Sequence, residues 1–454
     1  MNRMICVLRN ASRQSQCLLC KHTKRRLSNS VSVLSKTYKT DEWTNITPRI
    51  IAKTETKLLS NKNHPLNIVK QRITKFFHQK FGGYAGSSSP LFSTYEDFSP
   101  VVSIEQNFDV LLIAEDHVAR SKSDNYYINK DWVLRAHTSA HQSELIRAGL
   151  PAFLVFGDVY RRDEIDSSHF PVFHQCEGVR LFTKYQLFPN SDPISIQVQI
   201  NSSSGSMDGM HSIQQPQLFT SHERTSEYQE TLTMETSKML EYDLKSCLED
   251  LMNYLFSRRL NSRWNEVYFP FTHPSWELEI EHEGKWVEVL GCGVIEQKIV
   301  ADAGCPDRVG WAFGIGLERI AMLLYNIPDI RLFWSKDERF INQFQVADKG
   351  IDEPFKFKPF SNYMPMYNDI SFWLHSSAKF HENDFYDLVR SIGGDLVENV
   401  SCFDTYICNK TGRTSKAFRL TFRHFEKQLM QDDVNQIKKQ IEEAAKTELK
   451  VTVR

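Results

Sequence analysis

The sequence predicts an α+β fold with a large domain followed by a small one. Strand-like alternation and helix-like spacing are mixed from residue 41 to about residue 345. The 454 residues, 41% of them hydrophobic and 24% charged, are enough for two or three domains of ordinary globular composition. The stretch 346–358 has no clean periodicity, and the pattern changes after it. We therefore expect a large domain at 41–345, a linker at 346–358 and a small domain at 359–454.

The first 40 residues differ from the rest in charge. They contain nine Lys and Arg residues, frequent serine and no acid before Asp41. This composition is typical of a cleaved organelle transit peptide at residues 1–40, and a disordered basic tail is the alternative. Cys17 and Cys20, the one pair with CxxC spacing, lie inside this segment. Because the other cysteines are widely spaced, we expect reduced thiols and no zinc site here.

Charge and hydropathy limit the classes of partner. The formal net charge is −1, so a nucleic-acid partner would need a local basic face. No apolar run approaches the ~18–20 residues of a membrane span. The sequence therefore predicts no membrane partner.

Alternation and helical spacing place the elements of the large domain in order. Helices are expected where apolar residues recur three or four apart, and strands where they alternate. In chain order we expect a helix at 65–79, a short helix within 133–149, strands at 153–160 and 172–183, a polar insertion at 201–217, a long helix at 227–258, strands at 266–271 and 276–290, and a strand, glycine turn and helix at 310–330.

The small domain has a simpler order. We expect strands at 367–374, 395–408, 416–422 and 449–454, with helices at 382–392 and 432–446. Gly393 and Gly394 would close the first helix, and Asp432 or Asp433 would cap the second. The order βαββαβ predicts the ferredoxin-like fold, and about 95 residues suit one such domain.

A strand near the middle of the chain carries polar residues where a core face would be apolar. Phe173, Gln175 and Glu177 alternate, so they share one face of the predicted sheet. That face would be a poor core and a good floor for a polar ligand. Arg161 ends the preceding strand and offers a planar fork that matches phosphate, with a surface salt bridge as the alternative. Alternation points Arg162 away from Arg161, so we expect no catalytic role for it.

Two further segments could serve the same ligand. The stretch "GIGLER" at 314–319 opens a helix with Arg319 in its first turn, where an arginine is tolerated most readily beside an anion. A plain packing turn is the alternative. Glu288 lies in an apolar strand, and a carboxylate beside a phosphate site ordinarily holds Mg²⁺. Phe269 and Phe271 on one strand face would more often be core residues. His137 and His141 have helical spacing, but a zinc pair would need a third ligand.

Several phrases together resemble a known family. The resemblance is carried by "RAHTSAHQ" (135–142), "HFPVFHQCEG" (169–178), "FPFTHPS" (269–275) and "WAFGIGLERIAMLLYNIPDIR" (311–331). They are similar to the catalytic core of the phenylalanyl-tRNA synthetases, with motifs 2 and 3 of the class II aminoacyl-tRNA synthetases. The phrases "NDISFWL" (368–374) and "DFYDLVRSIGGDLVE" (384–398) resemble the anticodon-binding domain of the single-chain mitochondrial form. The resemblance covers nearly the whole chain after residue 41.

The resemblance implies a fold and a reaction. The fold would be a class II antiparallel-sheet catalytic domain followed by a ferredoxin-like anticodon-binding domain. The reaction would activate phenylalanine with ATP to phenylalanyl-adenylate and transfer it to the 3′-terminal ribose of tRNA(Phe) for mitochondrial translation. The expected partners are phenylalanine, ATP, Mg²⁺ and tRNA(Phe), in the mitochondrial matrix. The usual class II dimer helix is faint, which agrees with a monomer.

The resemblance also implies residue roles. Arg161, Arg319 and Glu288 would be catalytic, at the α-phosphate, the γ-phosphate and Mg²⁺ respectively. The residues implied for ATP are Arg161, Ser168, His169, Phe170, Phe173, Glu288, Gly316 and Arg319. The residues implied for phenylalanine are His137, Ser139, Ala140, His141, Gln142, Gln175, Glu177, Phe269, Phe271, Ala312 and Phe313. Because an apolar pocket rejects an added hydroxyl only by a factor of ~10², we expect measurable misactivation of tyrosine.

A basic stretch in the small domain gives a possible RNA contact. Lys416, Arg419 and Arg423 lie on or next to the strand expected at 416–422, and such a strand could hold tRNA phosphates. A solvated charged face is the alternative. Two other classes compete with a tRNA ligase: a catalytically dead paralogue, which the presence of both arginines and Glu288 disfavours, and an amide-forming ligase without tRNA, which the βαββαβ tail disfavours.

Overall fold

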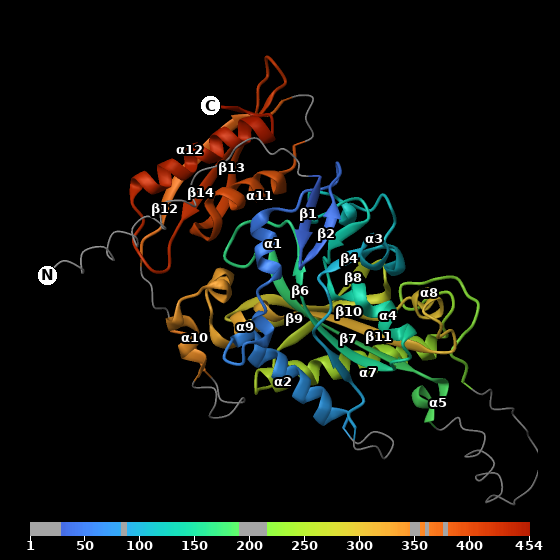
Figure 1. Cartoon of the computed structure of the whole chain (residues 1–454). Coiled ribbons are helices and arrows are strands. Elements are labelled where there is room, and N and C mark those ends of the chain that lie inside the picture. The colour runs from blue at the N-terminus through green and yellow to red at the C-terminus, as the bar shows by residue number, and fades with distance from the viewer. Residues whose placement is uncertain (1–28, 83–88, 190–215, 346–354, 359–362, 376–379) are drawn as a thin grey trace, which may run out of the picture.

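The structure, a computed structural model, has a large domain built on a seven-stranded sheet and a small domain built on a four-stranded sheet (Figure 1). The predicted α+β class is confirmed. The residues that it describes are 29–82, 89–189, 216–345, 355–358, 363–375 and 380–454. Most of the predicted transit peptide, insertion and linker lie outside these ranges. Among the described residues, no helix is long and apolar enough to cross a lipid bilayer.

The large domain is organised around one mostly antiparallel sheet of seven strands. Its strand order is β3-β6-β7-β11-β10-β9-β8, in which β3 runs parallel to β6 and every other neighbouring pair is antiparallel. In chain order the strands are β3 (Ser93–Tyr95), β6 (Ala152–Tyr160), β7 (Val172–Phe182), β8 (Ser262–Phe269), β9 (Thr272–His282), β10 (Lys285–Ile295) and β11 (Val309–Gly316). The strands predicted at 153–160 and 172–183 are confirmed.

One face of this sheet is covered by helices (Figure 1). The helices are α2 (Pro65–Lys80), α7 (Met234–Leu255) and α9 (Leu317–Tyr325). Leu244 and Leu248 of α7 recur at helical spacing and are fully buried in the main core. Phe77 of α2 stacks on Phe313 of β11, with ring centroids 5.6 Å apart. Because these helices pack on this face, the opposite face of the sheet is the one left open to a ligand.

Smaller elements complete the large domain. Their bounds are α1 (Pro48–Thr54), β4 (Val101–Ser103), α3 (Ile104–Asn107), β5 (Trp132–Leu134), α4 (Gln142–Arg147), α5 (Lys184–Leu187), α8 (Gln297–Asp302) and α10 (Glu338–Phe344), with short 3₁₀ turns at Val118–Arg120, Thr138–His141 and Ile330–Trp334 among others.

Two predicted element boundaries in the large domain are wrong. The long helix expected at 227–258 begins only at Met234, because the Thr233 side chain accepts from the Thr236 N–H and caps it there. The strand expected at 276–290 is two strands, β9 and β10. Glu283 and Gly284 join them with φ of 51° and 76°, the positive values that a tight hairpin turn requires.

A β-hairpin lies inside the predicted transit peptide. Its strands are β1 (Ser30–Val33) and β2 (Lys36–Lys39). Val33 is buried in the main core, and Asn129 donates to the Lys39 carbonyl at 2.9 Å. These contacts make the hairpin part of the large domain. A leader that is cleaved from the folded chain would therefore have to end before residue 30.

The small domain has the predicted βαββαβ order. Its sheet order is β13-β14-β12-β15, and both of its helices lie on one face. The elements are β12 (Met366–Trp373), α11 (Glu382–Gly393), β13 (Val397–Ile407), β14 (Thr414–Phe422), α12 (Gln431–Glu448) and β15 (Thr452–Val453). Gly394 has φ of 60° and closes α11 as predicted. The predicted cap of α12 is wrong, because Met430 takes that position and makes no side-chain cap bond.

Candidate active site

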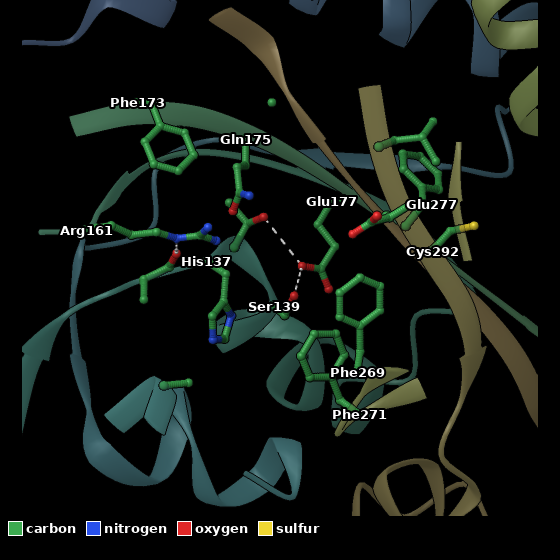
Figure 2. Close-up of a pocket in the computed structure, with 18 of the residues that line it drawn as sticks. His137, Ser139, Arg161, Phe173, Gln175, Glu177, Phe269, Phe271, Glu277 and Cys292 are labelled. Atoms are coloured by element: carbon green, nitrogen blue, oxygen red, sulfur yellow. Dashed lines mark hydrogen bonds between the residues drawn. The ribbon is translucent and has the colours of Figure 1, made fainter. Parts of the chain in front are cut away.

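A cavity of about 650 Å³ opens on the uncovered face of the large sheet. It is bordered by β7, β10 and β11, by residues 136–142, by the loop 161–170 and by the start of α9 (Figure 2). Gln175 and Glu177 of β7 point into it from the floor, as the alternation predicts. The polar face of β7 is therefore the floor of the cavity.

Glycines on the neighbouring strand create the space. Gly314 and Gly316 of β11 stand opposite Glu177 and Gln175 in the sheet register. A Cβ built on Gly314 would meet nothing within 4 Å, so a side chain there would project into open space. The sheet is thus hollowed where glycine replaces a larger residue. Gly316, predicted for ATP, borders the cavity.

Glu177 is the dominant polar group of the inner half. It is 2% exposed and its Oε2 accepts from the hydroxyls of Ser139 and Thr138, the latter at 3.4 Å. Its Oε1 is buried and has no hydrogen-bond partner in the structure. Burial raises the pKa of Glu177 to about 8, against the opposing effect of the two hydroxyls. The inner half of the cavity therefore holds a carboxyl group that a cationic ligand would complete.

The segment after His137 forms the opposite wall. His137 is extended and lines the cavity, and its pKa is lowered to about 3 by burial and by the nearby charge of Arg161. Ser139 and Gln142 also line the cavity, and the Gln142 Nε2 is buried without a partner. The wall therefore offers neutral donors beside the carboxyl of Glu177.

The structure does not bring Ala140 and His141 into the cavity. His141 is buried behind the wall, where its Nε2 lies 2.9 Å from Arg135 and its ring stacks on Phe98 at 4.4 Å. Ala140 packs in the core beneath. Because His137 is extended and His141 ends a 3₁₀ turn, the two rings do not share a helix face.

The apolar end of the cavity is built by aromatic rings. Phe269 ends β8 and Phe271 lies in the turn after it, so they do not share a strand as predicted. Their rings still stack, 5.8 Å apart and 9° from parallel, and both line the cavity. Ala312 borders the same end and leaves room there. The two stacked rings and the small Ala312 together make this end suitable for an aromatic side chain.

Phe313 also borders the cavity, but its ring packs elsewhere. It stands opposite Gly178 in the register, and a Cβ built on Gly178 would meet its ring at 2.2 Å. Its ring therefore lies on the helix-covered face, against Phe77. Period-two alternation separates the Phe313 ring from Ala312, so of the two residues predicted to close the pocket only Ala312 turns its side chain toward the cavity.

The outer half of the cavity begins with Arg161 and Phe173. The Arg161 Nε donates to the Ala136 carbonyl at 2.8 Å, and its guanidinium lies 5.2 Å from the centre of the Phe173 ring. A surface salt bridge from Arg161 to Asp163 or Glu164 is the alternative prediction. No such salt bridge occurs among the residues that the structure describes. Burial lowers the pKa of Arg161, with Asp163 and Glu288 opposing the effect. A half-buried cation with its fork toward a cavity is an anion-binding arrangement (Figure 2).

A polar loop continues from Arg161 along the rim. Asp166 accepts from the backbone N–H groups of Ser168 and His169, at 2.6 and 2.8 Å, and from the His169 ring at 2.8 Å. The bond to Asp166 raises the pKa of His169. Phe170 stacks on Trp334 at 5.7 Å behind the loop. The three predicted residues Ser168, His169 and Phe170 all line the cavity.

Arg319 and Glu288 close the outer half. Arg319 lies in the first turn of α9 with 41% of its side chain exposed, 3.5 Å from the Glu288 carboxylate. Glu277 of β9 also lines the cavity, and its pKa is raised by burial and by Glu288. Sequence reasoning missed Glu277, although "WELEI" at 276–280 alternates and places it on the face opposite Trp276. No group of three or more His, Cys, Asp or Glu that could hold a metal occurs among the described residues.

The chain matches two known domain families. Residues 50–188 and 221–344 match the family described as "tRNA synthetases class II core domain (F)". Residues 361–454 match the "Ferredoxin-fold anticodon binding domain". The two families follow each other as the large and small domains do.

Curated relatives agree over most of the chain. "Phenylalanine--tRNA ligase, mitochondrial" of Mus musculus is 51% identical over 415 residues, 91% of this chain and 87% of the relative. The Arabidopsis thaliana "Phenylalanine--tRNA ligase, chloroplastic/mitochondrial" is 41% identical over 414 residues, covering 91% and 83%. The mitochondrial protein of Saccharomyces cerevisiae is 36% identical over 436 residues, covering 88% and 89%. The chain belongs to the phenylalanine–tRNA ligase family.

The ligase carries one further candidate surface, the open face of the small sheet. Arg419 of β14 lies on this face, where it forms two bonds of 2.9 Å with Asp369 and lies 5.2 Å from the Phe403 ring. Arg423 pairs with Glu398 at 3.1 Å at the end of the strand. Lys416 differs from both, because it pairs with Glu382 of α11 on the helix-bearing side. The structure therefore does not place Lys416 with the two arginines.

Proposed function

We infer that the cavity of this ligase joins phenylalanine to the AMP part of ATP before the aminoacyl group passes to tRNA(Phe). The observation that carries this inference is a set of buried polar atoms without partners. Glu177 Oε1 and Gln142 Nε2 face the same cavity that Arg161 and Arg319 border. Buried polar groups in proteins are nearly always paired, so such atoms point to a polar ligand. The ammonium and carboxylate of an amino acid supply the missing partners.

The two halves of the cavity hold the two substrates. Glu177 accepts from the substrate ammonium group, and the ring lies against Phe269 and Phe271, with Ala312 leaving room for it. Phe173 stacks on adenine. This arrangement brings the substrate carboxylate toward Arg161.

The chemistry then needs alignment and charge stabilisation. A carboxylate oxygen of phenylalanine forms a bond to the α-phosphorus, and the bond to pyrophosphate breaks. Arg161 neutralises charge at the α-phosphate, and Arg319 orients the γ-phosphate in the leaving group. These arginines act mainly by positioning the substrates and by electrostatic stabilisation, without a covalent intermediate on the protein. Ser168, His169 and Phe170 cover the nucleotide from the rim.

Mg²⁺ fits the outer half. Glu277 and Glu288 are two carboxylates facing the proposed phosphate position, and Mg²⁺ is commonly bound by one or two carboxylates together with substrate phosphates. When bound, the ion would supply additional neutralisation of phosphate charge. Glu288 also lies 3.5 Å from the Arg319 guanidinium, so the same carboxylate orients the arginine.

The small domain would hold the tRNA. Arg419 and Arg423 offer positive charge at the open sheet face, and sheets of this fold bind RNA through exposed aromatic and basic residues. Arg413 and Arg454 both lie over Trp373 of β12, at 5.5 and 5.2 Å. We place the ligase in the mitochondrial matrix as a monomer, on the strength of the basic, acid-free leader and the faint dimer helix.

Amino-acid activation can be tested without tRNA. ATP–pyrophosphate exchange should occur with phenylalanine and should fall by about 10²–10³ in Arg161→Ala, the usual loss when a group that stabilises the transition state is removed. Arg263→Ala is the matched control, because Arg263 pairs with Glu279 at the sheet edge, away from the cavity. Absence of exchange with phenylalanine in the full-length protein would contradict the proposal. Exchange with tyrosine, slower by about 10², tests the expected misactivation.

A further inference from the structure

Four consecutive residues of the proposed ATP loop are bonded to the small domain. Arg162 pairs with Asp384 at 2.9 Å and with Asp387 at 3.4 Å, both in α11. Its carbonyl accepts from the Asn383 side chain at 2.9 Å. Arg390 donates to the carbonyls of the next two loop residues, 163 and 164, at 2.8 and 3.0 Å. The loop therefore meets α11 along its backbone as well as through a side chain.

The fourth residue is built into the small domain. Ile165 is 6% exposed and packs in the hydrophobic core formed by the small domain, although it belongs to the large one in sequence. Its carbonyl accepts from the Val400 N–H of β13 at 2.9 Å. A side chain from one domain thus fills the core of the other, which ties the loop to α11 and β13 together.

The far side of the loop is anchored to the same interface. The Ile330 N–H donates to the Ser167 carbonyl at 2.8 Å, and Ile330 also lines the cavity. Its neighbour Arg331 is buried, is held by Asp329, and donates to the Asp395 carbonyl of the small domain at 3.0 Å. The loop 161–170 is therefore held at residues 162–165 and again at Ser167, with the small domain behind it.

We propose that the small domain is a structural part of the ATP site, with Asn383 and Arg390 as positioning residues for the loop. Neither residue lines the cavity, so their action passes through the backbone of residues 162–164. The loop places Arg161 at one end and Ser168 and His169 at the other. A loop that is already ordered loses less conformational entropy when it closes on a ligand, and its affinity for that ligand is higher.

Two features of the cavity separate this role from a general effect on folding. The residues proposed for phenylalanine lie on β7, β11, the segment 137–142 and the end of β8 with its following turn, which make none of these contacts with α11. Loss of the α11 contacts should therefore weaken ATP and spare phenylalanine. The inference rests on the proposed function, because it assumes that Arg161 and His169 meet the nucleotide.

The test is ATP–pyrophosphate exchange by the full-length ligase without tRNA. Arg390→Ala should raise KM for ATP about tenfold, the loss expected for one or two charge-assisted hydrogen bonds. KM for phenylalanine should stay within about twofold. Asn383→Ala should raise KM for ATP in the same direction, and Arg390→Lys should recover part of the loss because a lysine keeps a donor there.

Arg49→Ala is the matched control. Arg49 of α1 donates to the Ser391 carbonyl at 2.9 Å, so it contacts the same helix of the small domain without touching the loop. Its KM for ATP should equal that of the wild type. An unchanged KM for ATP in both Arg390→Ala and Asn383→Ala, or an equal rise for both substrates, would overturn the inference. Absence of exchange in the wild type would instead reject the proposed function.

Discussion

The two halves of the cavity are built in opposite ways. The inner half lies on strands, where Glu177 is 2% exposed and its neighbours are neutral. The outer half is closed by a loop and a helix start over the strand residues Phe173 and Glu288, and there the Arg319 side chain is 41% exposed and charged groups face each other. A strand fixes the direction of its side chains through the sheet register. A loop does so only when other elements hold it.

The difference separates selection from catalysis. Phenylalanine has a defined size and shape, and side chains on rigid strands can discriminate it from other amino acids. The triphosphate is aligned by charge, which acts over longer distances and tolerates exposure. Substitutions in the inner half should therefore change the use of phenylalanine, whereas substitutions in the outer half should change the use of ATP. Each prediction below examines one side of this division.

The largest effect in the inner half is expected at Gly314. Gly314→Val adds a side chain that meets nothing in the empty cavity and occupies the space above Glu177. We expect kcat/KM for phenylalanine to fall by about 100-fold or more, with Gly314→Ala intermediate. KM for ATP should change far less, and Tm should stay within a few degrees. A loss shared equally by both substrates would contradict the separation of the two halves.

Gly178, on the neighbouring strand β7, leaves space for packing and not for a ligand. Gly178→Ala places its Cβ 2.2 Å from the Phe313 ring, so that ring must move within a packed core. Overpacking of this kind costs about 1–3 kcal/mol, and we expect denaturant unfolding to report a loss in that range. The residual activity of folded protein should keep a normal KM for phenylalanine. A normal unfolding midpoint would show that Phe313 relaxes into space that the packing does not reveal.

The sequence predicts the β7 floor of the cavity well because alternation is a local property. The shared face of Phe173, Gln175 and Glu177 is predicted from the period-two alternation and the identity of these three residues alone. The same rule separates Ala312 from Phe313, and the error at Phe313 came from taking both residues from the family resemblance together. The predictions that Ala140 and His141 line the pocket are wrong for a similar reason, since consecutive residues of a segment do not all face the same side.

The outer half depends on contacts between distant parts of the chain. Alternation correctly turned Arg162 away from Arg161, but its partners Asp384 and Asp387 lie more than 200 residues further along the chain. No local pattern identifies such a pair. The β1–β2 hairpin was missed for a related reason, because its basic, serine-rich composition resembles a leader while Val33 contributes to the core.

A pH profile examines the carboxyl of the inner half. The pKa of Glu177 is raised to about 8, so below pH 8 the empty site is mostly protonated and must lose that proton to bind an ammonium group. We expect kcat/KM for phenylalanine at saturating ATP to fall as the pH drops below about 8. Glu177→Gln cannot titrate, so its profile should be flat and lower by about tenfold at pH 8.

The sign of the stability effect follows from the same shift. The folded protein holds the Glu177 proton over the interval from about pH 4.5 to 8, in which the unfolded chain has lost it. The free energy of unfolding should therefore decrease with rising pH across this interval. Glu177→Gln should remove that decrease, as measured by urea unfolding at pH 5 and pH 8. A pH profile of kcat/KM that survives in Glu177→Gln would assign it to another group.

The smallest effect is expected on the open face of the small sheet. Arg419 is already paired with Asp369, so its loss removes only part of a positive charge from the surface. We expect Arg419→Ala to weaken tRNA binding a few-fold and to reduce the slope of log K against log salt by up to about one. Lys446→Ala is the control, because Lys446 pairs with Glu443 on α12. The exchange reaction, which needs no tRNA, should be the same in both variants. If Arg419→Ala leaves both tRNA affinity and its salt dependence unchanged, the tRNA phosphates are held elsewhere, and the charged sheet face is simply solvated.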